Sequence, residues 1–425
     1  MAVRQYTVTP SAARLATSLR DIGYDFATAV ADIVDNSIAA GATDIDVRFS
    51  SNPNRVVIAD NGSGMTANAL NEALRFGSRR EYSDGDLGRY GLGLKTASLS
   101  QCRSLTVVTR DARMVPPSLR QLNLDIIDEW DEWLVVDPSH SEAAEEAQAE
   151  LATRVGTIVI WESLDRAFPG RYAEGAWASR RAEMLKSKAA DHLALVFQRF
   201  IDGSAGRRVV VRVDGAPLEP WDPFARAELD THELDQRTFD VNESVHSGTV
   251  TLRRWILPAR NSFSSPAEFE RLGGPLKWNR QQGIYVYRAN RLVQWGGWAG
   301  IRAIDEHTKL ARCSLDFGTV LDPVFSINVA KMRVSVPSSL KRRLETPLHE
   351  ICQLANDRYR RASHEDTKRQ GRTAHSFSGA TDESAALALL SAAVQAGQYE
   401  PLKEIASVLV KQAPNVARRL GLDRI

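Results

Sequence analysis

The sequence has few cysteines and no long apolar run. Its three cysteines, Cys102, Cys313 and Cys352, are dispersed over 425 residues. Such a set offers neither a disulfide framework nor a zinc-binding pattern, which fits a reducing cytoplasm. No run of about 18 apolar residues occurs, so no membrane span is expected. Residues 1–19 also lack the apolar core of a signal peptide.

An excess of either charge is also missing. Lysine and arginine number 54 against 53 for aspartate and glutamate, so no global field favours nucleic acid or an anionic membrane. A local patch could still do so. Residues 277–312 interleave basic and aromatic side chains, which fits a nucleic-acid surface as well as an ordinary pair of strands with an aromatic core.

What the sequence does contain is a mixed pattern of helices and strands. Apolar residues recur at helical spacing in residues 24–40, whereas residues 45–50 and 55–60 alternate like strands. The acidic, alanine-rich residues 141–152 predict a polar helix in a solvated insertion. The length of 425 residues predicts two or three domains, and an apolar share of 43% is ordinary for a globular protein that buries a full core. Their predicted limits are 1–175, 176–345 and 346–425, with a linker near 371–384.

One predicted helix carries polar residues in an otherwise apolar stretch. Asp32 and Asn36 are four residues apart and therefore share one helix face. An acid beside an amide suits a general base next to a magnesium ligand, because Mg²⁺ takes few protein ligands and also binds water and phosphate oxygens. A solvated polar face that includes Asp35 gives the same pattern, so the helix alone does not decide.

A second segment ends a predicted strand. Asp60 follows β-branched residues and precedes Gly62 and Gly64. A carboxylate fixed there can accept a hydrogen bond from an exocyclic amine, and the glycines let a base approach the backbone closely. The same pattern is a common turn. Thr157, which precedes another strand, could reach a base through water or could simply favour β structure.

A third segment is rich in glycine. Gly88, Gly91 and Gly93 precede a predicted helix, whose first N–H groups and dipole favour an anion such as phosphate. Lys95 adds a cation to the first turn, where the dipole disfavours it unless an anion is bound there. Taken singly, this glycine spacing is weak evidence.

In order and spacing these segments resemble the nucleotide-binding signature of the GHKL superfamily, which includes gyrase-type topoisomerases, MutL, histidine kinases, the large heat-shock chaperones and MORC proteins. The sequence DIVDNSIAA resembles the N-box, DNGSGM the Asp-x-Gly-x-Gly box, GRYGLGLK the lid glycine box and the Gly-Thr pair at 156–157 the last adenine box. Within the superfamily, RYGLGLKTAS and GTIVIWESLDR are most similar to MORC and prokaryotic MORC-like ATPases. The resemblance implies an α+β fold: a Bergerat-fold ATPase α/β sandwich, then a transducer-like α/β domain and a small helical C-terminal tail.

The resemblance also implies ATP and Mg²⁺ as cofactors and assigns roles. Asp32 would be the catalytic base, Asn36 the metal ligand and Asp60 the residue that bonds the adenine amino group. Residues 77–92 would form a lid over the nucleotide. The sequence INVAKMRV resembles the transducer segment that sends a lysine to the γ-phosphate, which implies Lys331 as a second catalytic residue. The remaining implied cofactor-binding residues are Gly62, Gly64, Met65, Gly88, Gly91, Gly93, Leu94, Lys95, Thr96 and Thr157.

One departure from the superfamily pattern bears on activity. Members that hydrolyse ATP usually have Glu as the N-box base, and this sequence has Asp32. The shorter side chain would place the carboxylate about 1 Å from its optimum, which can cost on the order of 10²-fold in rate. The implied function is therefore a slow ATPase that acts as an ATP-gated dimeric clamp or switch in DNA-related processes or phage defence.

The alternative function is a nucleotide-binding regulatory subunit with little or no hydrolysis, which the short side chain of Asp32 favours. A histidine kinase is a poorer match, because no histidine lies on a helical-hairpin pattern before the N-box. The implied partners are a second copy of the chain, DNA and operon-encoded effector proteins, without a membrane and in the cytoplasm.

Overall fold

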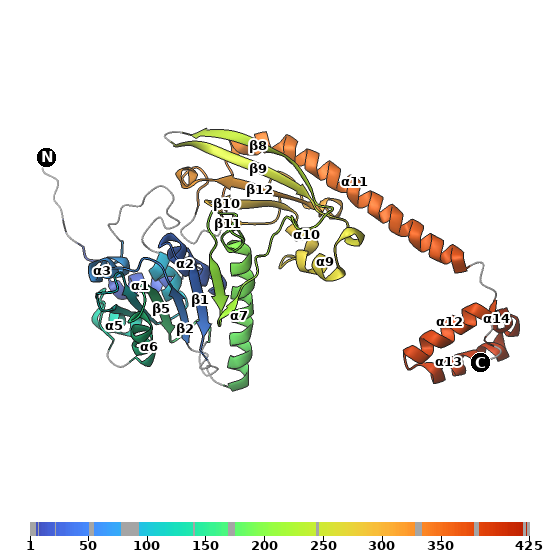
Figure 1. The fold of residues 1–425 in the computed structure, drawn as a ribbon, viewed down its shortest axis with the longest axis horizontal. Coiled ribbons are helices and arrows are strands. Elements are labelled where there is room, and N and C mark those ends of the chain that lie inside the picture. Colours follow the sequence, from blue (N-terminus) through green and yellow to red (C-terminus); the bar gives the residue numbers. More distant parts are fainter. Residues whose placement is uncertain are drawn as a thin grey trace. The chain divides into compact units, whose positions relative to one another are not determined.

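The computed structural model shows the fold of the chain (Figure 1). It describes residues 6, 8–21, 23–50, 55–77, 93–138, 141–168, 175–243, 246–327, 334–377, 382–419 and 422, with the backbone alone at 364–377, 382–388, 415, 418 and 419. The chain divides into two compact units, Met1–Ala355 and Asn356–Ile425. None of the described helices combines the length and the apolarity needed to cross a bilayer.

The first unit contains a seven-stranded sheet in the order β4-β3-β5-β2-β1-β6-β7. The pairings are antiparallel except that of β1 with β6, which is parallel. Strands β6 and β7 follow the long helix α7, so this sheet extends beyond the domain limit predicted at residue 175, and that limit stays a prediction. The strands are β1 (Asp44–Phe49), β2 (Arg55–Asp60), β3 (Ser104–Arg110), β4 (Ser118–Asn123), β5 (Gly156–Glu162), β6 (Val210–Val213) and β7 (Ala216–Pro217).

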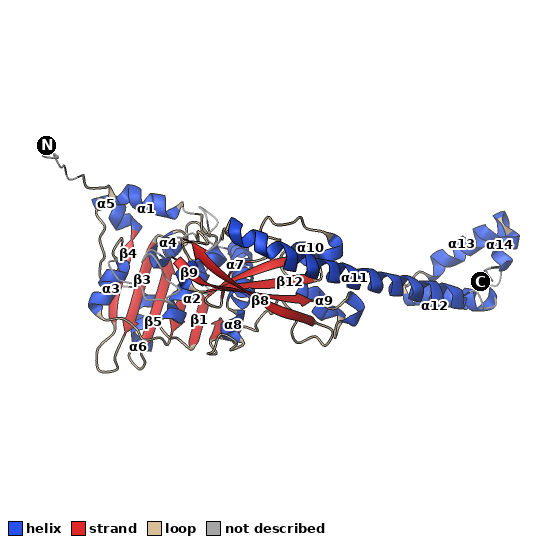
Figure 2. Ribbon diagram, turned by 90° about the horizontal axis from the view of Figure 1, so that it is seen from above, coloured by secondary structure: helices blue, strands red, loops and turns tan. Residues whose placement is uncertain are grey.

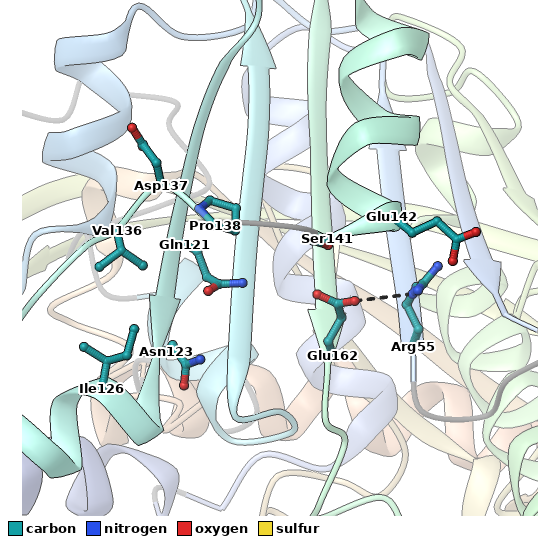
Figure 3. A pocket seen from close by; sticks show the side chains of 10 residues that line it. All are labelled: Arg55, Gln121, Asn123, Ile126, Val136, Asp137, Pro138, Ser141, Glu142 and Glu162. Carbon is teal, nitrogen blue, oxygen red and sulfur yellow. Dashed lines mark ion pairs between the residues drawn. The ribbon is translucent and has the colours of Figure 1, made fainter.

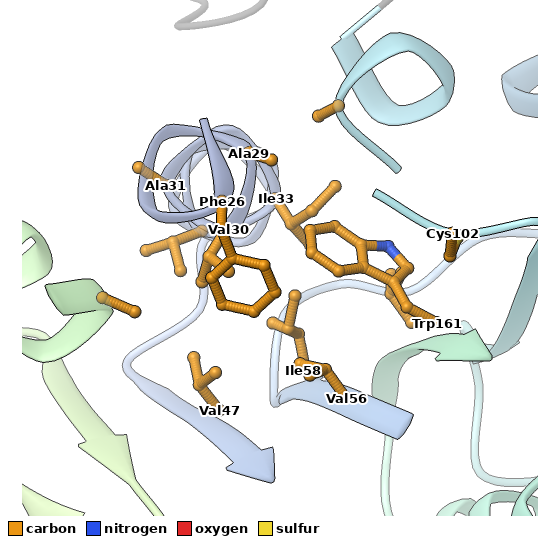
Figure 4. Packing of buried hydrophobic residues seen from close by; sticks show 14 of the residues in the cluster. Phe26, Ala29, Val30, Ala31, Ile33, Val47, Val56, Ile58, Cys102 and Trp161 are labelled. Atoms are coloured by element: carbon orange, nitrogen blue, oxygen red, sulfur yellow. The ribbon is translucent and has the colours of Figure 1, made fainter. Parts of the chain in front are cut away.

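One face of this sheet packs against helices around α2 (Phe26–Ala39). Phe26 and Ile33 of α2 lie against Trp161 of β5 in Figure 4, and the Phe26 and Trp161 rings meet edge to face with centroids 6.1 Å apart. This contact fixes α2 across the sheet, because two aromatic rings bury a large apolar area. The other helices of the sheet's surroundings are α1 (Ala12–Arg20), α3 (Ala67–Leu74), α4 (Gly93–Leu99), α5 (Leu124–Trp130), α7 (Gly175–Val196) and α8 (Gln198–Ile201).

The opposite face is covered by α6 (Glu142–Leu151), which is a correction to the predicted solvated insertion. Ala143, Ala147 and Leu151 are buried in a cluster with Ile158 and Ile160 of β5. The three helical residues are four positions apart and form one narrow apolar stripe. Glutamates dominate the rest of the helix, so its composition conceals the stripe.

A second, five-stranded sheet has the order β11-β10-β12-β9-β8, with β10 and β12 parallel and the other pairs antiparallel. Its strands are β8 (His232–Glu243), β9 (His246–Ile256), β10 (Gly283–Arg288), β11 (Arg291–Gln294) and β12 (Ala311–Phe317), and its helices are α9 (Pro266–Leu272), α10 (Lys277–Gln281) and the start of α11 (Ser338–Phe377). Short 3₁₀ helices occur at Arg260–Ser262, Glu306–Thr308 and Thr319–Leu321. The predicted α+β class, with a helix-covered sheet followed by a second sheet and terminal helices, is confirmed (Figure 2).

The basic and aromatic stretch at 277–312 forms strands and their connections in this second sheet. Tyr285 and Tyr287 are core residues, and Arg288, Arg291 and Arg312 are buried as well. The buried side chains make these three arginines structural partners, unavailable to phosphate groups of a nucleic acid.

The second unit contains α12 (Asp382–Gln395), α13 (Tyr399–Gln412) and α14 (Pro414–Arg419). Helix α11 continues to Phe377, inside the predicted linker at 371–384, and residues 378–381 lie outside the described residues.

Candidate functional site

Helix α2 presents the polar residues that the sequence singles out. Asp25 caps its N-terminus by accepting from the Thr28 N–H at 3.0 Å. Residues 28–35 are all buried, and Asn36 is exposed. An exposed amide after such a buried run is available to a ligand outside the helix. It fits Mg²⁺, which needs few protein ligands because water and phosphate oxygens complete its shell. No group of three metal-ligating side chains is found in the part of the chain that the structure describes.

The carboxylate of Asp60 is fixed by donors from three segments. The Ser37 hydroxyl of α2 donates to Oδ2 at 2.7 Å, and the N–H groups of Gly62 and Thr157 donate to Oδ1 at 2.8 and 3.2 Å. Asp60 is 6% exposed. Burial raises the pKa of Asp60, and the three donors oppose this rise because they favour the ionised form. We call Asp60, Ser37, Gly62 and Thr157 the Asp60 cluster.

The backbone conformation and a neighbouring carbonyl group require a glycine just after this cluster, whether or not a ligand binds. Gly64 has a φ of +64°, and a Cβ there would lie 2.0 Å from the carbonyl oxygen of Arg110. Next to it, the Met65 N–H donates to Thr109 Oγ1 at 2.9 Å, and that hydroxyl lies 3.0 Å from Thr157 Oγ1. The predicted residues Met65 and Thr157 therefore share one hydroxyl, which sequence reasoning did not identify. Its only signal is a buried threonine at the end of a strand.

Asp32 lies in a second, more deeply buried cluster. It is 2% exposed, and the Tyr24 hydroxyl donates to its Oδ2 at 2.7 Å. Arg291 of β11 places Nη2 3.6 Å from its Oδ1. A side chain at Gly93 would begin 3.9 Å from Oδ2, so α4 starts next to the carboxylate. Burial next to Asp32 raises the pKa of Tyr24, so Tyr24 remains a donor at neutral pH.

The same arginine holds a second acid of α2. Arg291 Nε donates to Oδ1 and Oδ2 of Asp35 at 2.9 and 2.7 Å. Arg291 is 2% exposed and Asp35 is fully buried. His192 of α7 is nearby, and burial together with the charge of Arg291 lowers the pKa of His192 to about 4. The histidine is therefore neutral at pH 7, and Arg291 is matched by carboxylates. We call Asp32, Asp35, Tyr24 and Arg291 the Asp32 cluster.

The predicted phosphate-binding residues of α4 have protein partners. Lys95 is fully buried and donates to the carbonyl oxygen of Ala73 at 2.6 Å. Burial lowers the pKa of Lys95 to about 8. The Thr96 hydroxyl donates to the Gly93 carbonyl at 3.4 Å, and Leu94 packs against the core. The contact with Ala73 differs from the predicted phosphate contact, which stays a prediction for these residues.

Several predicted residues lie outside the described residues. They are Gly88, Gly91, Lys331 and residues 78–92 of the predicted lid.

A separate pocket of about 590 Å³ was not anticipated from the sequence. Figure 3 shows it between strand ends and the start of α6, with Arg55 of β2 paired to Glu162 of β5 at 3.5 Å. Gln121 and Asn123 of β4 add amides. None of the predicted nucleotide-binding residues lines it, so it is distinct from both clusters.

Comparison with known proteins gives the class of residues 24–157, which include β1 to β4 and the start of β5. Residues 24–157 match the family described as histidine kinase-, DNA gyrase B- and HSP90-like ATPase. The match includes both clusters except for Arg291. Residues 24–157 therefore form a domain of the GHKL ATPase class.

Part of the chain is also similar to a MORC protein. The chain is 34% identical over 92 residues to the protein MICRORCHIDIA 6 of Arabidopsis thaliana, a match that covers 20% of this chain and 14% of that protein. The matched part is thus a small fraction of the relative's length. Among solved structures, the N-terminal domain of a DNA repair protein matches with a TM-score of 0.48 and 17% identity, over 82% of this chain and 98% of that chain.

Proposed function

We propose that this protein binds Mg-ATP in the region of the two clusters, hydrolyses it slowly, and thereby gates the association of two copies. Asp60 accepts a hydrogen bond from the adenine amino group. Asn36 supplies the amide ligand to Mg²⁺, which neutralises phosphate charge when bound. Asp32 accepts a proton from the attacking water, and Lys331 stabilises charge on the γ-phosphate.

The observation that carries this proposal is the fixed carboxylate of Asp60. Three donors satisfy part of its acceptor capacity without a cation within salt-bridge distance among the described residues. A carboxylate can accept about four hydrogen bonds, so capacity remains for a neutral donor such as an exocyclic amine. Ser37, one of the three donors, is adjacent in sequence to Asn36, so recognition and metal binding would be placed by one helix.

The test combines binding, turnover and size. ATP binding should require Asp60 and be strengthened by magnesium in calorimetry, and phosphate release should be slow and magnesium-dependent. In parallel, a non-hydrolysable ATP analogue should convert monomers to dimers in light scattering. A chain that stays monomeric with saturating analogue would contradict the gated association.

A DNA-directed role, in DNA maintenance or phage defence, is proposed from the resemblance to MORC and MutL proteins. If dimerisation closes a clamp, circular DNA should be retained after analogue binding and released after linearisation. Equal retention of both forms would contradict a clamp, and operon-encoded effector proteins would then be the partners to test.

A second candidate is a nucleotide-binding regulatory subunit without useful turnover. It is favoured by the burial of Asp32 and by the engagement of its two oxygens by Tyr24 and Arg291. Phosphate release at the same near-zero rate from the wild type and from Asp32→Asn, together with normal ATP binding, would support this candidate against the ATPase.

A further inference from the structure

The hairpin of β10 and β11 sends side chains to three different elements. Its two turn residues, Ala289 and Asn290, have φ values of 46° and 68°, as in the tight turns that join antiparallel strands. Before the turn, Arg288 pairs with Asp322, which directly follows the 3₁₀ helix Thr319–Leu321, with Nε–Oδ1 and Nη2–Oδ2 distances of 2.7 Å. At the turn, Asn290 accepts from Arg199 at 3.3 Å. Contacts with Asp322 and with Arg199 therefore fix the position of the hairpin.

After the turn, the side chain of Arg291 extends away from the second sheet to helix α2, which packs on the first sheet. Its guanidinium bonds both oxygens of Asp35 and lies 3.6 Å from Asp32. The two acids are three residues apart on α2, so one side chain spans almost one helical turn. All three side chains are at most 2% exposed. Burial makes this pairing obligatory, because an unpaired charge at such a position is strongly unfavourable.

The orientation of Asp32 therefore depends on two neighbours. Tyr24 binds Oδ2, and Arg291 faces Oδ1. A carboxylate whose two oxygens each face a different partner is restrained in its rotation about the side-chain bonds. This restraint matters more for Asp than for Glu, because the shorter chain has fewer rotatable bonds with which to recover a lost position.

We propose that Arg291 is a positioning residue for ATP hydrolysis: it orients Asp32 through the joint pairing with Asp35, and so makes the base depend on the seating of the second sheet. This role rests on the proposed ATPase function and adds to it a coupling between the two sheets. The resemblance already implies a role for Lys331, which would act at the γ-phosphate. Arg291 would act instead on Asp32, the side chain that activates the attacking water.

The test uses the full chain with Arg291→Gln and Arg291→Lys. Arg288→Gln is the matched control, because it breaks an equally buried pair on the same hairpin without touching α2. Arg291→Gln should lower kcat by about 10²-fold, as expected for a displaced catalytic group. KM for ATP and the affinity for a non-hydrolysable analogue should change less than about threefold. Arg291→Lys keeps the charge and should recover part of kcat.

Urea unfolding of each variant separates positioning from folding. Both glutamine variants should be less stable, and only Arg291→Gln should lose turnover in the folded fraction. If Arg291→Gln does not fold, Arg291→Lys and Asp35→Asn carry the test, and the effects of Asp35→Asn and Arg291→Lys on kcat should be non-additive.

The outcomes distinguish this inference from the function on which it rests. Equal losses of kcat in Arg291→Gln and Arg288→Gln, an unchanged kcat in Arg291→Gln, or a higher one would overturn the positioning role while leaving the ATPase intact. A wild-type chain that binds ATP without any magnesium-dependent turnover would overturn the proposed hydrolysis and the positioning role with it.

Discussion

Helix α2 is held by two separate clusters. Ser37, near its C-terminus, binds Asp60 in the Asp60 cluster, whose other members come from the first sheet and its connections. Asp32 and Asp35, nearer the middle of the helix, pair with Arg291, which lies 256 residues after Asp35 in the second sheet. The proposed contact to the nucleotide base is therefore supported within the first sheet and its helices, whereas the proposed catalytic base depends on both sheets.

The two clusters should therefore fail separately. Changes in the Asp60 cluster should reduce affinity, and changes in the Asp32 cluster should reduce turnover. A variant in one cluster that lowers affinity and turnover to the same degree would contradict the separate roles of the two clusters.

The largest effect is expected at the base itself. Asp32→Asn keeps the size of the side chain and removes its ability to accept a proton, so kcat should fall by roughly 10²- to 10⁴-fold. Steady-state phosphate release measures this, and affinity for the analogue should stay nearly constant. Asp32→Glu, with the side-chain length usual in the superfamily, should retain turnover. Unchanged kcat in Asp32→Asn would remove Asp32 from the chemistry.

A smaller effect is expected in the Asp60 cluster. Asp60→Asn replaces a charged acceptor by an amide, and hydrogen bonds to charged groups contribute about 1.5–3 kcal/mol. Affinity for ATP should therefore fall by roughly 10- to 100-fold. Calorimetry with the analogue checks this. Asp44→Asn on neighbouring β1, whose carboxylate pairs with Arg212, is the control and should leave affinity unchanged.

The backbone below the Asp60 cluster gives a third test. Gly64→Ala would place Cβ 2.0 Å from the Arg110 carbonyl oxygen at a φ of +64°, so the free energy of unfolding should fall by at least about 2 kcal/mol. Gly77→Ala has a similar φ of +70° with no atom within 4 Å, and should cost only the strain of the left-handed backbone. Urea unfolding compares them, and equal losses would show that the contact with Arg110 is unimportant.

An effect that is confined to alkaline pH is expected from Lys95. Its pKa is lowered from 10.5 to about 8 by burial, so the unfolded chain binds more protons than the folded chain between these values. Stability should therefore rise with pH from about 8 towards 10.5. Lys95→Met should make urea unfolding less dependent on pH in this window. An identical pH dependence in both proteins would contradict the cause assigned here.

The sequence allowed the prediction of features that are local in the chain. Helix periodicity predicts α2, and the turn after β2 predicts a carboxylate followed by glycines. Asp32 and Asn36 differ in exposure, so their joint role stays a prediction. The pairing of Arg291 with Asp35 could not be predicted, because an Asn-Arg turn indicates a hairpin and carries no information about the partner of its arginine. The apolar stripe of α6 was missed for a related reason, since alanines among glutamates show little hydrophobic contrast.

The parallel pairing of β1 with β6 has a practical consequence for dissecting this molecule. The match to the ATPase family ends at residue 157, but Val210–Val213 supply the neighbour of β1 in the same sheet. Truncation before this segment would leave the backbone of β1 without that hydrogen-bonding neighbour, and such open strands attract other polypeptides. A fragment designed to bind ATP by itself should therefore extend at least through Pro217, beyond residue 157 where the family match ends.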